Sequence, residues 1–186
     1  ISSAASDVYK RQMYNSDGSQ AEMCGNATRC VGKYVYDRGL TDKTQITLET
    51  LAGIKILDLN VKDGEVQTVR VNMGSPELVP KNIPIDSNLD RFISEDVEVD
   101  GKVYKVTGVS MGNPHAVTFI DDTDSLEIEK IGPKFETHKL FPKKINTEFA
   151  QIVDRNTIKM RVWERGAGET PVSYTHLRAH ETGAYL

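Results

Sequence analysis

The sequence has 186 residues, enough for one large domain or two small ones. Hydrophobic residues make up 38% and charged residues 27%, a composition that excludes an intrinsically disordered chain, and no apolar run reaches the roughly 18 residues of a membrane-spanning helix. The formal net charge of −4 argues against a protein whose main function is to bind nucleic acid, because such binding depends largely on neutralising phosphates.

The two ends of the sequence differ from the rest. Residues 1–12 and 172–186 show no clear period, and both resemble the translated adapter sequence that contaminates the ends of some assembled reading frames. We expect them to be foreign tails, which leaves a body of about residues 13–171. His176 and His180 have the i, i+4 spacing of metal ligands on a helix, but they fall in the second tail and carry no prediction.

The first half of the body, residues 13–74, predicts one helix followed by three strands. After a polar, turn-rich segment, a helix with a period near 3.6 starts at residues 24–26 and runs to Val35, and Gly39 is its expected stop. The strands alternate apolar and polar residues and cover residues 45–50, 54–61 and 66–73.

Residues 74–76, Gly-Ser-Pro, break this pattern, and the second half covers residues 75–171. An irregular stretch precedes a hairpin, a loop at residues 111–115, a further strand, a helix interrupted at Gly132-Pro133, and a last hairpin. The expected strands are residues 97–99, 103–109, 116–120, 146–154 and 157–164, and the helix lies within residues 124–139. Strands dominate, with one helix in each half, which predicts an α+β fold of two similar units rather than a regular βαβ repeat.

A cysteine stands where the first predicted helix begins. Cys24 is followed by Gly25 and Asn26. The backbone N–H groups and the positive dipole end of a helix start favour a thiolate and can bind a carboxylate ligand, and glycine lets a ligand approach the backbone closely. A reactive thiol beside a carboxylate site is one interpretation, and a structural cysteine beside a turn is the other. Cys30, inside the helix, is predicted to be a core residue.

Two later segments also carry polar groups at defined places. Asn113 precedes a proline, which holds it extended so that its amide can point outward, although a plain turn explains the same pattern. Glu164 and Arg165 lead from a strand into a glycine-rich loop. A carboxylate that accepts from an ammonium group and a guanidinium that binds a carboxylate suit a zwitterionic ligand, with a solvated turn as the alternative. The loop lacks the spacing and the lysine of a phosphate-binding P-loop.

The cysteine and histidine content limits other chemistry. Two cysteines are too few for a disulfide scaffold, and two cysteines with four scattered histidines form no zinc pattern. We therefore expect no zinc site. The N-terminus has no apolar signal segment, and a reducing, cytoplasmic location is the default expectation.

Together the motifs resemble the diaminopimelate epimerase family. The matching segments follow that family's order over about residues 13–170 and cover residues 15–19, 23–26, 29–30, 112–115 and 164–170. The resemblance implies two pseudo-symmetric α+β halves of mostly antiparallel strands around a helix, with the active site in the cleft between them. It also implies conversion of LL- to meso-diaminopimelate, in lysine and cell-wall precursor synthesis, without pyridoxal phosphate or metal.

The resemblance assigns roles that agree with the chemistry. Inverting the α-carbon of an amino acid requires a base that removes the proton and an acid that returns one from the opposite face, and two thiols can do both. The carbanion formed in between needs stabilising N–H donors, which helix starts provide. The resemblance implies that Cys24 is one of two catalytic cysteines and that His115 lies close to the thiols. It implies substrate contacts for Asn15, Gly25, Asn26, Asn113, Asn146, Glu164 and Arg165.

The sequence also departs from the family pattern. The family continues after its Gly-Glu-Thr segment into a second Cys-Gly motif, whereas no cysteine follows Cys30 here. The family's opening segment before Asn15 is absent, and Ala27 stands where the family usually has glycine. We therefore expect an internal fragment, truncated at both ends and inactive as an epimerase.

Two alternatives to diaminopimelate epimerase remain open. One is another two-thiol racemase or isomerase of the same fold, such as one that acts on proline, and the other is a non-catalytic module that binds an amino acid. Residues 164–170 favour diaminopimelate, because this substrate offers a second polar amino-acid end. The expected partner is thus a small amino acid, without nucleic acid or membrane, and both a monomer and a homodimer stay open.

Overall fold

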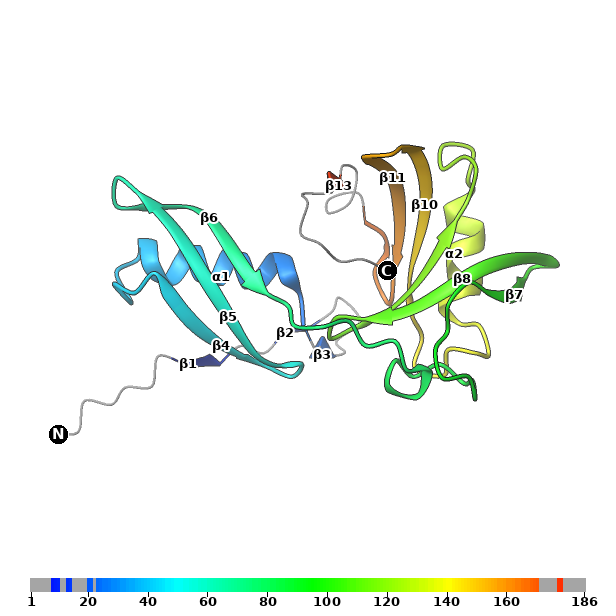
Figure 1. The fold of residues 1–186 in the computed structure, drawn as a ribbon, viewed down its shortest axis with the longest axis horizontal. Helices are drawn as coiled ribbons and strands as arrows, with labels where there is room; N and C mark the ends of the chain where they lie inside the picture. The colour runs from blue at the N-terminus through cyan, green and yellow to red at the C-terminus, as the bar shows by residue number, and fades with distance from the viewer. Residues whose placement is uncertain (1–7, 11–12, 15–19, 22, 171–176, 179–186) are drawn as a thin grey trace. The chain divides into compact units, whose positions relative to one another are not determined.

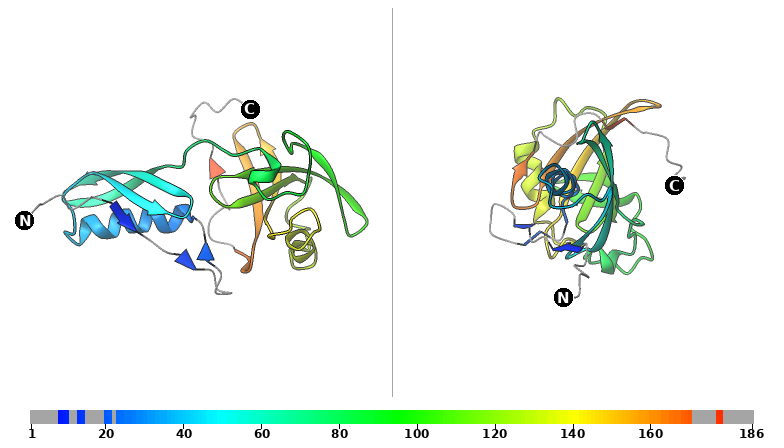
Figure 2. Two further views of the ribbon diagram at one scale, coloured as in Figure 1. Left: turned by 90° about the horizontal axis from the view of Figure 1, so that it is seen from below. Right: turned by 90° about the vertical axis from the view of Figure 1, so that its left-hand side faces the viewer.

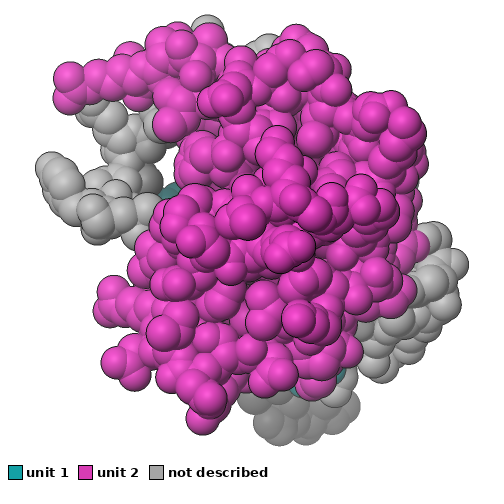
Figure 3. Space-filling view, turned by 90° about the vertical axis from the view of Figure 1, so that its right-hand side faces the viewer, with its two compact units in different colours: residues 1–75, 111–113 teal, residues 76–110, 114–186 magenta. Residues whose placement is uncertain are grey.

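The computed structural model describes residues 8–10, 13–14, 20–21, 23–170 and 177–178. The chain divides into two compact units (Figure 1), of which unit 2 is drawn in magenta in Figure 3. Unit 1 consists of residues 1–75 and 111–113, and unit 2 of residues 76–110 and 114–186. Within the described part of the chain, neither helix is long and apolar enough to span a membrane.

Unit 1 is a four-stranded sheet with one helix along one face (Figure 2). The strands lie in the order β1-β4-β5-β6, with β1 parallel to β4 and the other pairs antiparallel. Their bounds are Val8–Lys10 for β1, Gln45–Thr50 for β4, Gly53–Lys62 for β5 and Glu65–Asn72 for β6. Helix α1 spans Gly25–Asp37, and a separate two-stranded ribbon joins β2 (Met13–Tyr14) to β3 (Gln20–Ala21).

The helix of unit 1 packs very close to its sheet. Gly32 lies on the buried face of α1, and a Cβ atom there would come within 3.0 Å of Leu57 Cδ2 and 3.1 Å of Leu59 Cδ2. The apolar residues of β4 and β5 alternate with exposed ones, as the sequence predicts, and their inward side chains form the core under the helix. The fully buried members of this core are Val35, Ile46, Leu48, Leu57, Leu59 and Val66.

The predicted end of this helix is confirmed in detail. Gly39 has φ of +67°, and its N–H donates to the Tyr36 carbonyl at 2.8 Å, while the Leu40 N–H donates to the Val35 carbonyl at 2.9 Å. These two bonds form a Schellman motif, which needs a left-handed residue just past the helix and therefore favours glycine.

Unit 2 is built on a larger sheet with the strand order β12-β11-β10-β9-β8-β7. Strands β9 and β10 are parallel, the other neighbours are antiparallel, and β13 also pairs with β11. The strands are β7 (Glu95–Val99), β8 (Lys102–Ser110), β9 (Pro114–Phe119), β10 (Asn146–Asp154), β11 (Thr157–Glu164), β12 (Gly168–Glu169) and β13 (Leu177–Arg178). Helix α2 (Ile128–Glu136) packs against this sheet, and a short 3₁₀ helix, η1 (Pro80–Asn82), precedes β7.

The two units repeat one order of connection. In unit 1 the chain runs from β1 through the β2–β3 ribbon and α1 to the parallel strand β4, and then to the antiparallel strands β5 and β6. In unit 2 it runs from β9 through α2 to the parallel strand β10, and then to the antiparallel strands β11 and β12. The predicted α+β class with two pseudo-symmetric halves is confirmed at the level of topology.

Three features of the fold differ from the expected elements. The loop expected at residues 111–115 ends earlier, because Pro114 already begins β9 and His115 lies in that strand. Pro133 does not interrupt α2, which continues to Glu136, since the buried side chains of this short helix anchor it to the sheet on both sides of the proline. Strand β1, in the segment expected to be a foreign tail, pairs with Thr47–Glu49 of β4; the origin of that segment stays a prediction.

The core of unit 2 centres on a contact between α2 and β11. A Cβ atom on Gly132 would lie only 2.3–2.5 Å from ring atoms of Trp163, and Trp163 is buried. Aromatic rings extend this core, since Phe135 makes edge contacts with Tyr104 and Phe149 at centroid distances of 5.1 and 5.3 Å. Only a glycine allows α2 to approach the indole this closely.

We predict that Gly132→Ala destabilises the protein by about 1–3 kcal/mol, because the added methyl group must displace a buried ring. Alanine is the better helix former by about 1 kcal/mol, so helix propensity alone would make the variant more stable. A loss of stability therefore shows that the packing contact dominates. Urea unfolding measures it. Glu129→Ala, at an exposed position of the same helix, is the control and should change the stability by less than about 0.5 kcal/mol. A Gly132→Ala variant that is as stable as wild type would contradict the close contact.

Candidate active site

Cys24 caps the N-terminus of helix α1. Its backbone is extended, with φ of −137° and ψ of 110°, and its carbonyl accepts both the backbone N–H and the hydroxyl of Thr28, each at 2.9 Å. The Cys24 side chain makes no capping hydrogen bond and is exposed. The thiol therefore stands at a helix start, as the sequence predicts, and the buried Thr28 secures that first turn.

The neighbouring residues of the first turn are partly buried. Asn26 Oδ1 accepts a hydrogen bond from Arg29 Nη2, one turn along the helix. A Cβ atom on Gly25 would meet its nearest neighbours, Arg29 and Met73, only at 4.0 Å, so crowding within the fold does not demand glycine there. Its assigned contact with a substrate stays a prediction.

The segment Met111–Asn113 belongs to unit 1 and packs beside the start of α1. Gly112 has φ of +115°, and a Cβ atom there would lie 2.7 Å from Ala52 Cβ and 3.2 Å from Met23 Cβ. Met23 is only 3% exposed and directly precedes Cys24. The structure thus brings the Gly112–Asn113 motif to the same unit and neighbourhood as the Cys24–Asn26 motif, although about ninety residues separate them in sequence.

The second cysteine does not take the predicted place. Cys30 lies in α1 but is exposed, and the core under the helix is formed by Thr28, Gly32 and Val35 instead. The prediction that Cys30 is a core residue is wrong. The buried face of the helix lies about one residue further around the helix axis than the spacing of the apolar residues indicated.

In unit 2, Asn146 connects two strands and a loop. It is 7% exposed; its Nδ2 donates to the Pro114 carbonyl at 2.9 Å, and its Oδ1 accepts the Arg165 N–H at 2.9 Å. The start of β9 and the turn that follows β11 are therefore tied to the first residue of β10. A direct contact of Asn146 with a substrate stays a prediction.

Glu164 and Arg165 form the turn at the end of β11 and are both partly buried. Glu164 Oε1 accepts the Thr170 hydroxyl at 2.9 Å, and its carbonyl accepts the Ala167 N–H at 3.1 Å. Arg165 Nη1 donates to the Lys143 carbonyl at 3.2 Å. The carboxylate and guanidinium expected to bind a zwitterion are thus adjacent and held at one end of the sheet.

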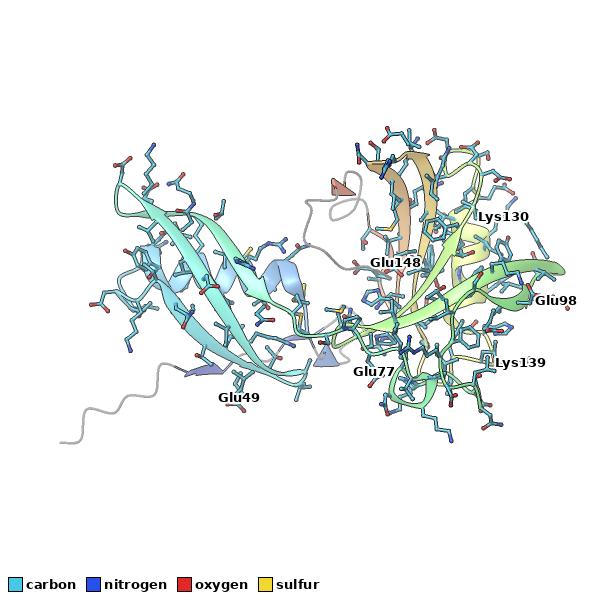
Figure 4. All side chains as sticks on the ribbon, viewed as in Figure 1. Glu49, Glu77, Glu98, Lys130, Lys139 and Glu148 are labelled. Carbon is cyan, nitrogen blue, oxygen red and sulfur yellow. The ribbon has the colours of Figure 1, made fainter. Side chains whose placement is uncertain are left out.

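His115 forms a close pair with Glu148, which sequence reasoning did not identify. Glu148 is labelled in Figure 4. His115 Nδ1 lies 2.5 Å from Glu148 Oε1, and Glu148 is 5% exposed. Burial lowers the pKa of His115, but the hydrogen bond and charge of Glu148, with the charge of Glu164, outweigh it and place the pKa above its usual value of 6.5. A charged residue inside a predicted strand, directly before Phe149 and Ala150, was the available sequence signal.

A second buried carboxylate, also missed in the sequence, supports the turn after β11. Glu136, at the end of α2 and 7% exposed, accepts hydrogen bonds from Trp163 Nε1 at 2.8 Å, Lys144 Nζ at 3.0 Å and the Gly166 N–H at 3.2 Å. Burial raises the pKa of Glu136, but these three donors outweigh it and hold the pKa below its usual value. The residues on both sides of Glu164 and Arg165 are thereby anchored to the helix.

Several other sequence assignments fall outside the described residues. Asn15, expected to contact substrate, is one, and the pair His176 and His180 is another. In the part of the chain that the structure describes, no group of three or more histidine, cysteine, aspartate or glutamate side chains is arranged to hold a metal ion.

Solved structures define the class of fold. A hydroxyproline epimerase from Agrobacterium vitis has a TM-score of 0.65 at 11% identity, over 86% of this chain and 49% of that chain. A probable proline racemase from Agrobacterium radiobacter K84 has a TM-score of 0.64 at 15% identity, over 91% of this chain and 53% of that one. At such identities the likeness concerns the fold alone, which is the α+β fold with two related halves that these proteins share.

Sequence comparison then identifies the family. The family model described as diaminopimelate epimerase matches residues 2–79 and 107–176. The diaminopimelate epimerase of Acetivibrio thermocellus is 62% identical over 162 residues, and that of Methanococcus maripaludis strain S2 is 56% identical over 167 residues. The chain belongs to the diaminopimelate epimerase family. The two matches include 87% and 89% of this chain, which spans 58% and 60% of the relatives' length.

We predict that Glu136→Gln lowers the stability at neutral pH and that the difference from wild type shrinks in acid. Because the folded-state pKa of Glu136 lies below its usual value of 4.5, its contribution is complete above about pH 4.5 and is lost as the pH falls through the folded-state pKa. Urea unfolding of both proteins between pH 3 and 7 measures this. Glu129→Gln, an exposed carboxylate on the same helix, should lie within about 0.5 kcal/mol of wild type at neutral pH. A pH-independent difference for Glu136→Gln would contradict the assignment.

Proposed function

We propose that this protein acts in the interconversion of LL- and meso-diaminopimelate, a step of lysine biosynthesis, with Cys24 as one of two acid–base thiols. The observation that carries the proposal is the exposed Cys24 at the start of α1, beside the Gly112–Asn113 turn, in a chain of the diaminopimelate epimerase family. The relatives that bear this name and are 56–62% identical to the chain support the same activity.

The proposed mechanism is proton transfer at the α-carbon. The Cys24 thiolate removes the α-proton from one face, or its thiol returns one when the reaction runs in the other direction, while a second acid acts on the opposite face. Negative charge that develops on the substrate is stabilised by backbone N–H groups at the helix start. Both roles need the sulfur exposed and close to the backbone of the first turn, which is where Cys24 lies.

Substrate recognition in this proposal uses paired charges and amides. Glu164 would accept hydrogen bonds from an ammonium group, and Arg165 would bind a carboxylate. The side-chain amides of Asn26 and Asn113, in unit 1, would supply further donors and acceptors, and Asn15 and Gly25 are assigned to the same role by family resemblance. The support in the structure is that Glu164 and Arg165 are adjacent and anchored through Asn146 and Glu136.

The acid on the opposite face of the carbon is not Cys30 in this proposal. Cys30 lies six positions after Cys24, which in a helix corresponds to a rise of about 9 Å and a rotation of about 240°. Two thiols placed in this way cannot flank one carbon atom. The sequence contains no third cysteine.

We therefore predict that the 186-residue polypeptide does not invert diaminopimelate. Incubation with the LL isomer in D2O, followed by chiral chromatography and mass spectrometry, measures both inversion and exchange of the α-proton. The expected result is no meso product, with exchange at most slow and abolished by Cys24→Ala, because one thiol can remove and return a proton on one face only. Full turnover to the meso isomer by the purified chain would overturn the two-thiol mechanism.

Protection of Cys24 from alkylation tests the proposed site without requiring turnover. Both cysteines are exposed, so Cys30 serves as the internal control. With diaminopimelate at about ten times its Kd, we expect iodoacetamide to modify Cys24 about tenfold more slowly, in proportion to the unbound fraction, and Cys30 at an unchanged rate. Peptide mass spectrometry over time measures both rates.

The same experiment separates the alternatives. Protection of Cys24 by proline but not by diaminopimelate would favour a proline racemase-like activity, and protection by neither would overturn the proposed site. Protection of Cys24 by diaminopimelate, together with unchanged activity of a full-length relative in which the equivalent cysteine is replaced by alanine, would show that this thiol lies in the binding site but is not the acid or base. The proposal has two further parts: a cytoplasmic location, which keeps Cys24 reduced, and assembly as a homodimer. Cell fractionation tests the location, and sedimentation tests the assembly.

A further inference from the structure

The geometry around His115 points to a role for Glu148, a residue that neither the motifs nor the proposed mechanism uses. We propose that Glu148 is a positioning residue: its buried carboxylate holds the proton of His115 on Nδ1 and so presents Nε2 to the bound amino acid. The inference rests on the proposed function for its ligand, whereas the pairing itself rests on unit 2 alone.

The pairing is defined by distance and burial. His115 Nδ1 lies 2.5 Å from Glu148 Oε1, and the exposed fractions of the two side chains are 18% and 7%. An ionised carboxylate accepts hydrogen bonds and cannot donate one, so the nitrogen that faces it must carry the proton. The neutral imidazole then has its free lone pair on Nε2.

The second oxygen of the carboxylate strengthens this assignment. Among the described residues, Glu148 Oε2 is buried without a hydrogen-bond partner. The desolvation cost of a buried carboxylate is poorly offset when it has a single partner. The hydrogen bond to His115 is therefore the main interaction that offsets this cost for Glu148. Exchange of that bond for the other ring nitrogen would require the ring to turn over inside unit 2.

The strand register places this pair next to the residues expected to recognise substrate. Asn146 and Glu148 alternate along β10 and so share one face of the sheet, and Asn146 is the register partner of His115 on β9. Asn146 in turn accepts the Arg165 N–H. The charges of Glu164 and Arg165 both act on the His115 ring. His115 is thus part of the same cluster as the zwitterion-binding pair.

Imidazole NMR on the wild-type chain provides the first test. Long-range ¹H–¹⁵N spectra distinguish a protonated from an unprotonated ring nitrogen, and His115→Gln assigns the signals. We expect neutral His115 to carry its proton on Nδ1. His138 is the matched internal control with the opposite expectation, because its Nδ1 accepts the Leu140 N–H at 3.3 Å and must be unprotonated. A neutral His115 protonated on Nε2 would overturn the proposal without any need for a variant.

Neutralising the carboxylate provides the second test. Glu148→Gln keeps an acceptor of the same shape but removes the charge, so the pKa of His115 should fall, whereas the His138 signals should match those of wild type. Glu169→Gln is the control and should leave the titration of His115 unchanged. This half-buried carboxylate of the same unit accepts hydrogen bonds from Arg161 Nε and Nη2, at 2.7 and 2.9 Å, instead of from His115. An unchanged His115 titration in a folded Glu148→Gln chain would overturn the proposal; if this variant does not fold, the wild-type spectrum decides.

Addition of diaminopimelate separates this inference from the proposed function. We expect the His115 Nε2 resonance and the backbone amide of Arg165 to shift together, with His138 unaffected. A response of Arg165 without one at His115 Nε2 would overturn the positioning role and leave the proposed function in place. No response at either residue would overturn the proposed function itself.

Discussion

The constraint on which the structure depends is the close approach of one helix to one sheet in each unit. In both units a glycine makes this approach possible: Gly32 faces the leucines of β5, and Gly132 faces the indole of Trp163. Because interiors are densely packed, such a contact fixes the depth and the direction of the helix. The start of α1 places Cys24, and the end of α2 places Glu136, so the positions of these two polar groups follow from apolar packing.

Unit 2 adds a second layer of control through two buried carboxylates. Glu136 collects three donors around the turn after β11, and Glu148 engages one ring nitrogen of His115. Each carboxylate would be costly to bury alone: Glu136 is compensated by its three donors, whereas His115 is the main compensating partner of Glu148. The hydrogen bonds to these partners also restrict the geometry of the proposed recognition residues. Such support by residues behind the contacting ones is typical of sites that must hold a precise geometry.

The repeated topology gives the proposed chemistry a structural rationale. Reaction on two faces of a carbon atom needs two groups of similar kind, and a fold made of two related halves can place one such group at an equivalent point of each half. In unit 1 the helix follows a strand and begins at Cys24. In unit 2, helix α2 begins at Ile128 after Glu127, so its N-terminus carries no thiol.

The sequence by itself determined the elements and the family, because both depend on local signals. Alternation, helical period and the glycine at position 39 reproduce β4, β5 and β6 of unit 1 and the end of α1, and short contiguous motifs carry the family resemblance. Only the tertiary structure decided which side chains meet. His115 and Glu148 are 33 residues apart, and Glu136 and Gly166 are 30 apart. Pairing over such distances depends on strand register and helix packing, which no local pattern encodes.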